Sequence, residues 1–172
     1  MNSQIISQLS KRLLIHFSLL MGIILLFFSV KAQERPPKPI TVTVSTLQHL
    51  SFGSFIQCGT NGTVTVTPEG ARIATGNIIL PNMSSIVTPA LFEVTALPGT
   101  LITIVNGPDS PLSGSNGGTI MLQIGESSTN SPFIANSDHT EVFIGGTLTV
   151  GSLMANPAGA YSGIFQVTFI QQ

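Results

Sequence analysis

Side chains that could carry acid–base or metal chemistry gather in one short segment, Asp138-His-Thr-Glu141. Two carboxylates beside an imidazole could bind a divalent cation or move a proton. In an extended chain, however, neighbouring side chains point to opposite faces, so Asp138 and His139 would not converge. We therefore expect a polar loop between two strands here. His49 is expected at a strand end or on a wet face, without a catalytic role.

The common motifs of enzymes and metal proteins do not occur in the chain. There is no GxSxG turn for a hydrolase nucleophile, no GxxxxGK[ST] or GxGxxG loop for phosphate, and no HExxH or paired CxxC for zinc. We expect a protein that is not an enzyme. It should have no catalytic, cofactor-binding or metal-binding residues and no cofactor.

Cys58 is the only cysteine of the chain, so an internal disulfide cannot form. We interpret Cys58 as a small buried or loop residue. A reactive thiol, or a dimer joined through Cys58, is the alternative.

Charge is scarce in this sequence and unevenly placed. Only 8% of the 172 residues are charged, and the chain has six Lys and Arg in total. A phosphate-binding surface needs clustered basic side chains, so nucleic acid is not an expected partner. Beyond residue 32, three basic residues (Arg35, Lys38 and Arg72) stand against seven acidic ones, a net charge of −4.

The first 32 residues have the pattern of an export signal. A polar start ends in Lys11-Arg12 and is followed by the apolar run 13–30. Val30-Lys31-Ala32 fits a cleavage site, so we predict a signal peptide over 1–32 and export to the periplasm, outer cell surface or extracellular space. The alternative is an uncleaved membrane anchor, because the run has about the length that spans a bilayer. The Pro-rich segment 33–39 favours cleavage, which would leave no membrane span.

The rest of the chain, residues 40–172, alternates with the period of β-strands and shows no helical pattern. Turn residues such as Asn61-Gly62 and Pro98-Gly99 separate the strands. The expected strands lie at 40–44, 62–67, 100–105, 119–124, 147–150 and 161–170. One face of most strands is aliphatic and the other carries Thr, Ser or Gln. This pattern predicts an all-β domain, an immunoglobulin-like antiparallel β-sandwich with a single core.

Several short motifs occur in a characteristic order between residues 50 and 163. They are Leu50-Ser-Phe-Gly53, Gly62-Thr-Val-Thr-Val66, Pro68-Glu-Gly-Ala-Arg72, Pro89-Ala-Leu-Phe-Glu-Val94, Gly145-Gly-Thr-Leu-Thr-Val-Gly151 and Gly159-Ala-Tyr-Ser-Gly163. In these motifs the chain resembles an exported bacterial family known as domain of unknown function 4402. That family is similar in turn to spore-coat and pilin-like immunoglobulin-fold subunits. The resemblance implies a sandwich fold and a surface or extracellular destination, and it supplies no catalytic residues.

Two features depart from the pilin-like pattern. Such subunits usually have a disulfide near the first strand, which this chain cannot form. They also carry an alternating N-terminal extension that completes the sheet of the next subunit, whereas residues 33–39 contain three prolines. Proline cannot donate to a strand ladder, so this segment is a poor donor strand unless Ile40–Val44 takes that role.

The sequence leaves two functional hypotheses open. The first is an exported, non-enzymatic structural or adhesive surface protein. It would associate with itself or with a periplasmic chaperone through the C-terminal strand, Tyr161 to Ile170. The alternative is an exported module that binds a ligand, such as a glycan, at the sandwich-end loops 106–118 or 127–140.

Overall fold

The computed structural model describes residues 36, 38–45, 47–81 and 85–172. The predicted signal peptide and its cleavage site lie outside these residues. The described part folds into strands alone: β1 (Thr41–Val44), β2 (Ser51–Phe52), β3 (Ile56–Val66), β4 (Arg72–Ile79), β5 (Val87–Thr88), β6 (Ala90–Thr95), β7 (Leu101–Asn106), β8 (Ser110–Gly114), β9 (Thr119–Ser127), β10 (Phe133–Ile134), β11 (His139–Val150), β12 (Tyr161–Ser162) and β13 (Val167–Gln171). Nowhere in this part is there a helix with the length and apolar character to cross a membrane.

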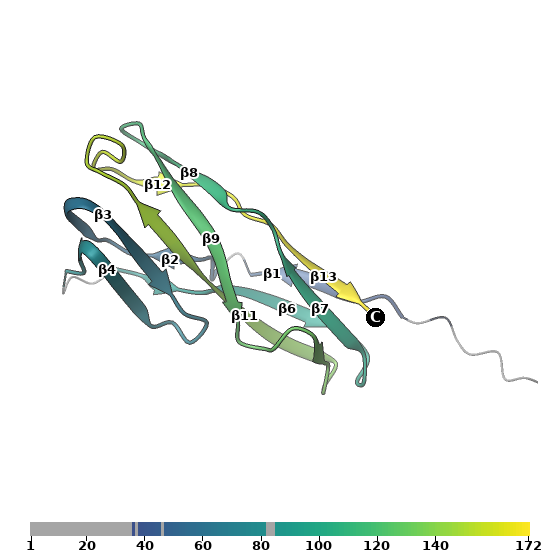
Figure 1. The fold of residues 1–172 in the computed structure, drawn as a ribbon. Helices are drawn as coiled ribbons and strands as arrows, with labels where there is room; N and C mark the ends of the chain where they lie inside the picture. The colour runs from purple at the N-terminus through teal and green to yellow at the C-terminus, as the bar shows by residue number, and fades with distance from the viewer. Residues whose placement is uncertain (1–35, 37, 46, 82–84) are drawn as a thin grey trace, which may run out of the picture. The chain divides into compact units, whose positions relative to one another are not determined.

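Antiparallel pairing organises these strands into one large sheet and two smaller ones. The large sheet has the order β1-β6-β11-β9-β8-β12, with β3 and β4 branching from β11. A second sheet has the order β10-β7-β13, and β2 pairs with β5. Figure 1 shows the C-terminal ribbon in yellow running beside β8 and then β7.

The long strand β11 holds the large sheet together. Its first half pairs with β6, and its second half pairs with β3 and β9. The ladder with β9 is irregular between Ile144 and Gly146. A side chain at Gly145 would collide with the carbonyl of Val66 on β3. Glycine at this point therefore allows β3 to approach β11 where β6 ends.

The three-stranded sheet forms the second layer over one half of the large sheet. The Phe92 ring on β6 lies 5.5 Å from the Phe169 ring and 6.5 Å from the Phe165 ring, measured between centroids. These contacts place β13 over β6. Asn106 at the end of β7 donates from Nδ2 to the carbonyl of Gly125 on β9 at 2.8 Å, which places β7 toward β9. The two layers enclose the core.

The core is built from the inward positions of the alternating strands. Its largest fully buried side chains are Ile102, Ile120, Ile144, Val64, Val66, Val94, Val142 and Val150. The Thr residues between them lie outward and pair across strands, for example Thr65 with Thr147 at 2.9 Å between hydroxyl oxygens. This division of apolar and hydroxyl faces confirms the predicted antiparallel β-sandwich.

The C-terminal strand differs from its prediction. The alternating segment 161–170 forms two strands, β12 and β13, rather than one. Its partner segment changes from β8 to β7 at this point, and Pro108 and Pro111 lie opposite the interruption. Proline has no N–H to donate, so the ladder cannot continue past them.

The Tyr161 hydroxyl bonds to the loop that precedes β12. The hydroxyl donates to the carbonyl of Pro157 at 2.7 Å. Beside it, the buried side chain of Asn156 accepts from the N–H of Gly151 at 2.5 Å and donates to the carbonyl of Thr119 at 2.6 Å. These bonds fix the loop 151–160 against the end of the sandwich.

Candidate functional site

Only Asp138 of the segment Asp138–Glu141 lies in the loop that the sequence predicted, and the other three residues belong to a strand. β11 begins at His139, because His139, Thr140 and Glu141 pair with Thr95, Val94 and Glu93 of β6. The His139 ring lies 3.2 Å from the Thr95 hydroxyl, between Nδ1 and Oγ1. Among the described residues, no group of His, Cys, Asp and Glu side chains could hold a metal ion.

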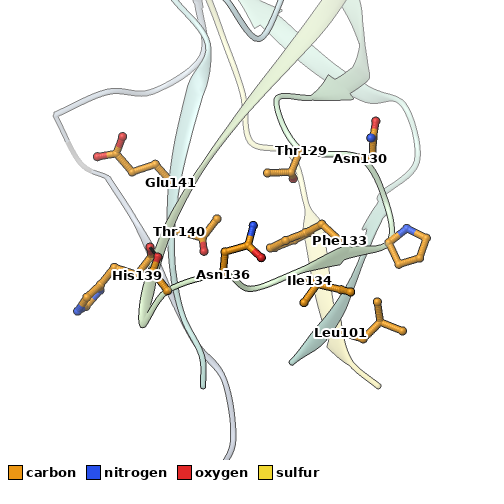
Figure 2. Close-up of a pocket in the computed structure, with 11 residues that line it drawn as sticks. Leu101, Thr129, Asn130, Phe133, Ile134, Asn136, His139, Thr140 and Glu141 are labelled. Carbon is orange, nitrogen blue, oxygen red and sulfur yellow. Dashed lines mark hydrogen bonds between the residues drawn. The ribbon is translucent and has the colours of Figure 1, made fainter. Parts of the chain in front are cut away.

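A shallow hollow lies beside this segment, under the loop between β9 and β11. Its volume is about 710 Å³, and it is lined mainly by residues of 129–141 together with Leu101. Figure 2 shows Phe133, Thr129 and Asn136 directed into the hollow, while His139 and Glu141 extend away from it. The hollow therefore offers an apolar ring and polar amide and hydroxyl groups, and it lacks a converging pair of titratable groups.

Cys58 and His49 lie elsewhere and are both exposed. Cys58 is part of an irregular stretch of β3 in which residues 58–61 stand opposite Asn77 of β4. The side chain of Gln57 donates to the carbonyls of Thr60, at 3.0 Å, and of Gly151. Of the two interpretations of Cys58, a buried residue or a loop residue, the first is wrong, because Cys58 is exposed in this irregular stretch.

The edges of the two sheets differ in how they are protected against pairing. Natural sheets protect their edges with short strands, bulges, prolines or charges. In the described part, β10 and β12 have two residues each, and Lys38-Pro39 stands shortly before β1. β4 contains Gly76 at a φ of 67°, where its ladder with β3 shifts register. β13 has five residues without a charge, a proline or a register shift. It is the least protected edge of the described strands.

The free edge of β13 can be assigned atom by atom. On one side β13 pairs with β7, and the bonds from Gly107 N–H to the Gln166 carbonyl and from Gln172 N–H to the Leu101 carbonyl fix the alternation. Residues 166, 168, 170 and 172 therefore bond to β7. The N–H and C=O groups of Val167, Phe169 and Gln171 point to the other side, where no described backbone group pairs with them.

Strand β1 lies near this free edge, on the opposite layer (Figure 1). The Gln171 side chain connects the two: its Oε1 accepts from the N–H of Ile40 at 3.2 Å, and its Nε2 donates to the carbonyl of Lys38 at 3.3 Å. Because β13 lies over β6, and β1 is the neighbour of β6 at the sheet edge, the position opposite β1 in the second layer is vacant among the described residues.

Burial decreases toward this vacant position. Val42 and Val44 pair with Val94 and Phe92 of β6, and therefore face the core side of the sheet. Val94 and Phe92 are buried, whereas Val42 is half-buried and Val44 is 57% exposed. The inward side chains of β13 are likewise only half-buried. We call this uncovered surface the β1–β13 groove: the side chains of Ile40, Val42, Val44, Phe165, Val167 and Phe169 and the free edge of β13.

The sequence model of one family, described as a domain of unknown function (DUF4402), matches residues 42–170. The chain belongs to this family. The matched range of the DUF4402 domain begins within β1 and ends within β13, so it includes both strands that bound the groove. No curated protein and no solved structure matches the chain.

Sequence reasoning identified the C-terminal strand of the DUF4402 domain as an edge but missed the groove. The alternation of 161–170 and the absence of charge gave the first signal. The groove depends on which strands face each other across the core, and only the Phe92 and Asn106 contacts reveal that arrangement.

Proposed function

We propose that the chain is an exported, non-enzymatic structural or adhesive protein of the cell surface or extracellular space. Export rests on the signal-peptide pattern of residues 1–32. The assembly role rests on one structural observation, the free edge of β13 with its outward N–H and C=O groups at Val167, Phe169 and Gln171. β-Strand addition at such an edge joins other copies of the chain or a periplasmic chaperone.

The apolar character of the edge supports this role. A row of unpaired backbone groups in water forms hydrogen bonds with the solvent, so a partner strand gains little from the ladder alone. In the β1–β13 groove, an added strand would also cover half-buried Val167 and Phe169 and exposed Val44. Removing apolar surface from water supplies the additional driving force.

The export part is tested by fractionating cells that express the chain and measuring its intact mass. We expect a chain that begins at Gln33 and that is found in the envelope or the medium. Protease added to whole cells should be able to cleave it. An Ala32→Asp variant, which removes the small residue at the cleavage site, should retain residues 1–32. A chain that retains Met1 and stays in the cytosol would contradict the proposal.

The assembly part is tested by cross-linking whole cells and recovering the chain. Adducts with a second protein or with further copies are expected, and a Val44→Lys variant should reduce them. Thr43→Lys is the matched control, because Thr43 is exposed on the outer face of the same strand. Adducts that are equally abundant in both variants would exclude the groove as the contact surface.

A second function, binding of a glycan, is favoured by the hollow beside the segment that connects β9 and β11. An aromatic ring with neighbouring amides, as Phe133, Asn130 and Asn136 provide, can stack on a sugar and hydrogen-bond to its hydroxyls. A glycan array would test this alternative. Signals that Asn136→Ala lowers and Asn77→Ala, a control on β4, leaves unchanged would support it; an array without signals above background would refute it.

A further inference from the structure

We propose that the β1–β13 groove is a receptor for a single extended strand of a partner protein, which is free of proline and carries apolar, uncharged side chains at the alternate positions that face the groove. This inference rests on the free edge used in the proposed function and specifies its occupant. The groove is the second-layer position between the edge of β13 and the inward face of β1, which no described strand occupies.

β1 is the single described strand beyond β6 in the large sheet, so the position above it has room for one strand and excludes the edge of another folded domain of this kind. Suppose that β13 of a second copy paired with β13 of the first. The second copy would then also bring its own β6, which packs beneath its β13 through the contact of Phe92 with Phe169. The place beneath is already filled by β1 of the first copy. A strand without a second layer beneath it avoids this collision, so the occupant is an extended segment.

The chemistry of the groove defines the sequence of the occupant. The outward N–H and C=O groups of Val167, Phe169 and Gln171 require a partner backbone that can both donate and accept, which excludes proline at the paired positions. None of the side chains that define the groove is charged, so a charged side chain facing inward would be buried without a partner. Alternate residues of a strand point to the same face, so every second residue should be apolar.

The described part of this chain has no spare strand that could fill the groove of a second copy. Ile40–Val44 has the required alternation, but it already pairs with β6 over four residues. Moving it to another copy would break one ladder to form a similar one. Residues 33–39 contain three prolines and cannot form the ladder. A strand of a different protein adds a ladder without removing one.

The test uses the exported chain and a synthetic probe, the acetylated hexapeptide Ile-Thr-Val-Thr-Val-Ser, which has the sequence of residues 40–45. Amide exchange is followed by NMR during titration with the peptide. We expect saturable 1:1 binding and exchange of the Val167, Phe169 and Gln171 amides slowed by about tenfold or more, with Thr168 and Ile170 unchanged. A control peptide with proline in place of the central valine should not bind.

Two protein variants locate the site. Val44→Lys should weaken peptide binding by about tenfold or more, because it places a charge in the groove, while Thr43→Lys should bind as the unchanged chain does. Val167→Pro removes one outward N–H without removing a bond to β7, and it should also weaken binding. Circular dichroism spectra of all variants should match that of the unchanged chain.

Several results would overturn the inference. They are the absence of saturable binding up to about 1 mM peptide, protection of β6 amides in place of β13 amides, or full binding by Val44→Lys. Oligomers that form without peptide and that Val44→Lys abolishes would identify a second copy as the occupant. A failure of this inference is distinguishable from a failure of the proposed function. A cytosolic location would leave peptide binding intact, and absence of peptide binding would leave export intact.

Discussion

Val44 lies directly opposite Phe92 in the ladder between β1 and β6, yet Val44 is 57% exposed and Phe92 is 6% exposed. Both side chains face the core side of the sheet. The difference arises in the second layer, where β13 covers Phe92 and no described strand covers Val44. Among the residues that the structure describes, the sandwich is therefore complete over β6 and incomplete over β1.

This gradient predicts unequal costs for equivalent truncations on neighbouring strands. Val94→Ala should lower the free energy of unfolding by about 2 kcal/mol, because Val94 is fully buried. Val44→Ala should change it by no more than about 0.5 kcal/mol, since the side chain is mostly in water. Denaturation in urea measures both values. Equal costs would mean that something covers Val44.

The Gln171 side chain should hold the start of β1 to the end of β13. Gln171→Ala removes the bonds to the Ile40 N–H and the Lys38 carbonyl and should cost about 1 kcal/mol. The Ile40 amide should exchange faster in this variant. In the control Gln172→Ala, only a bond to the Thr103 hydroxyl is lost, and Ile40 exchange should not change. Unchanged Ile40 exchange in Gln171→Ala would refute the link.

Asn156 should be among the most sensitive polar positions of the domain. Asn156→Ala leaves the Gly151 N–H and the Thr119 carbonyl without their partner, and a cost of about 2 kcal/mol is expected. Asn116→Ala removes an exposed bond to the Ala158 carbonyl and should cost about 0.5 kcal/mol or less. Thermal unfolding compares the two. Equal melting temperatures would show that Asn156 does not fix the loop.

The turn between β3 and β4 predicts a small pH effect. A hydrogen bond from the Thr67 side chain, and then one from the backbone of Glu69, lowers the pKa of the exposed Glu69 carboxyl. Because the pKa of this carboxyl is lower in the folded state than in the unfolded state, its ionisation stabilises the folded state at pH values above the unfolded-state pKa. This contribution is lost as the pH falls through the folded-state pKa. In Thr67→Val the pKa of Glu69 should rise toward its ordinary value, as NMR titration would show. An unchanged pKa would exclude Thr67 as the cause.

Strands whose alternation is undisturbed could be predicted from sequence nearly to the residue. The expected strand 40–44 is β1, and 100–105 is β7 shifted by one position. The start of a strand could not be predicted where it depends on contacts with other strands or side chains of the domain. β3 extends back to Ile56 because Gln57 organises the bulge 58–61, and β11 begins at His139 because β6 provides a partner for polar residues.

The candidate site could be predicted only in part. The C-terminal strand is recognisable as an uncharged edge, and the loop 127–140 contains most of the hollow. Which edge of β13 is free depends on its pairing with β7, a contact between residues about 65 positions apart. The interruption between β12 and β13 depends on Pro108 and Pro111. Their effect can be recognised only when it is known that they lie opposite the C-terminal segment.

The most direct test of the groove is the exchange of the β13 backbone amides in the exported chain without any added ligand. The free edge predicts an alternation: Thr168 and Ile170, which bond to β7, exchange slowly, whereas Val167, Phe169 and Gln171 exchange fast. Slow exchange at all five positions would show that the edge is already covered and would contradict the vacant strand position.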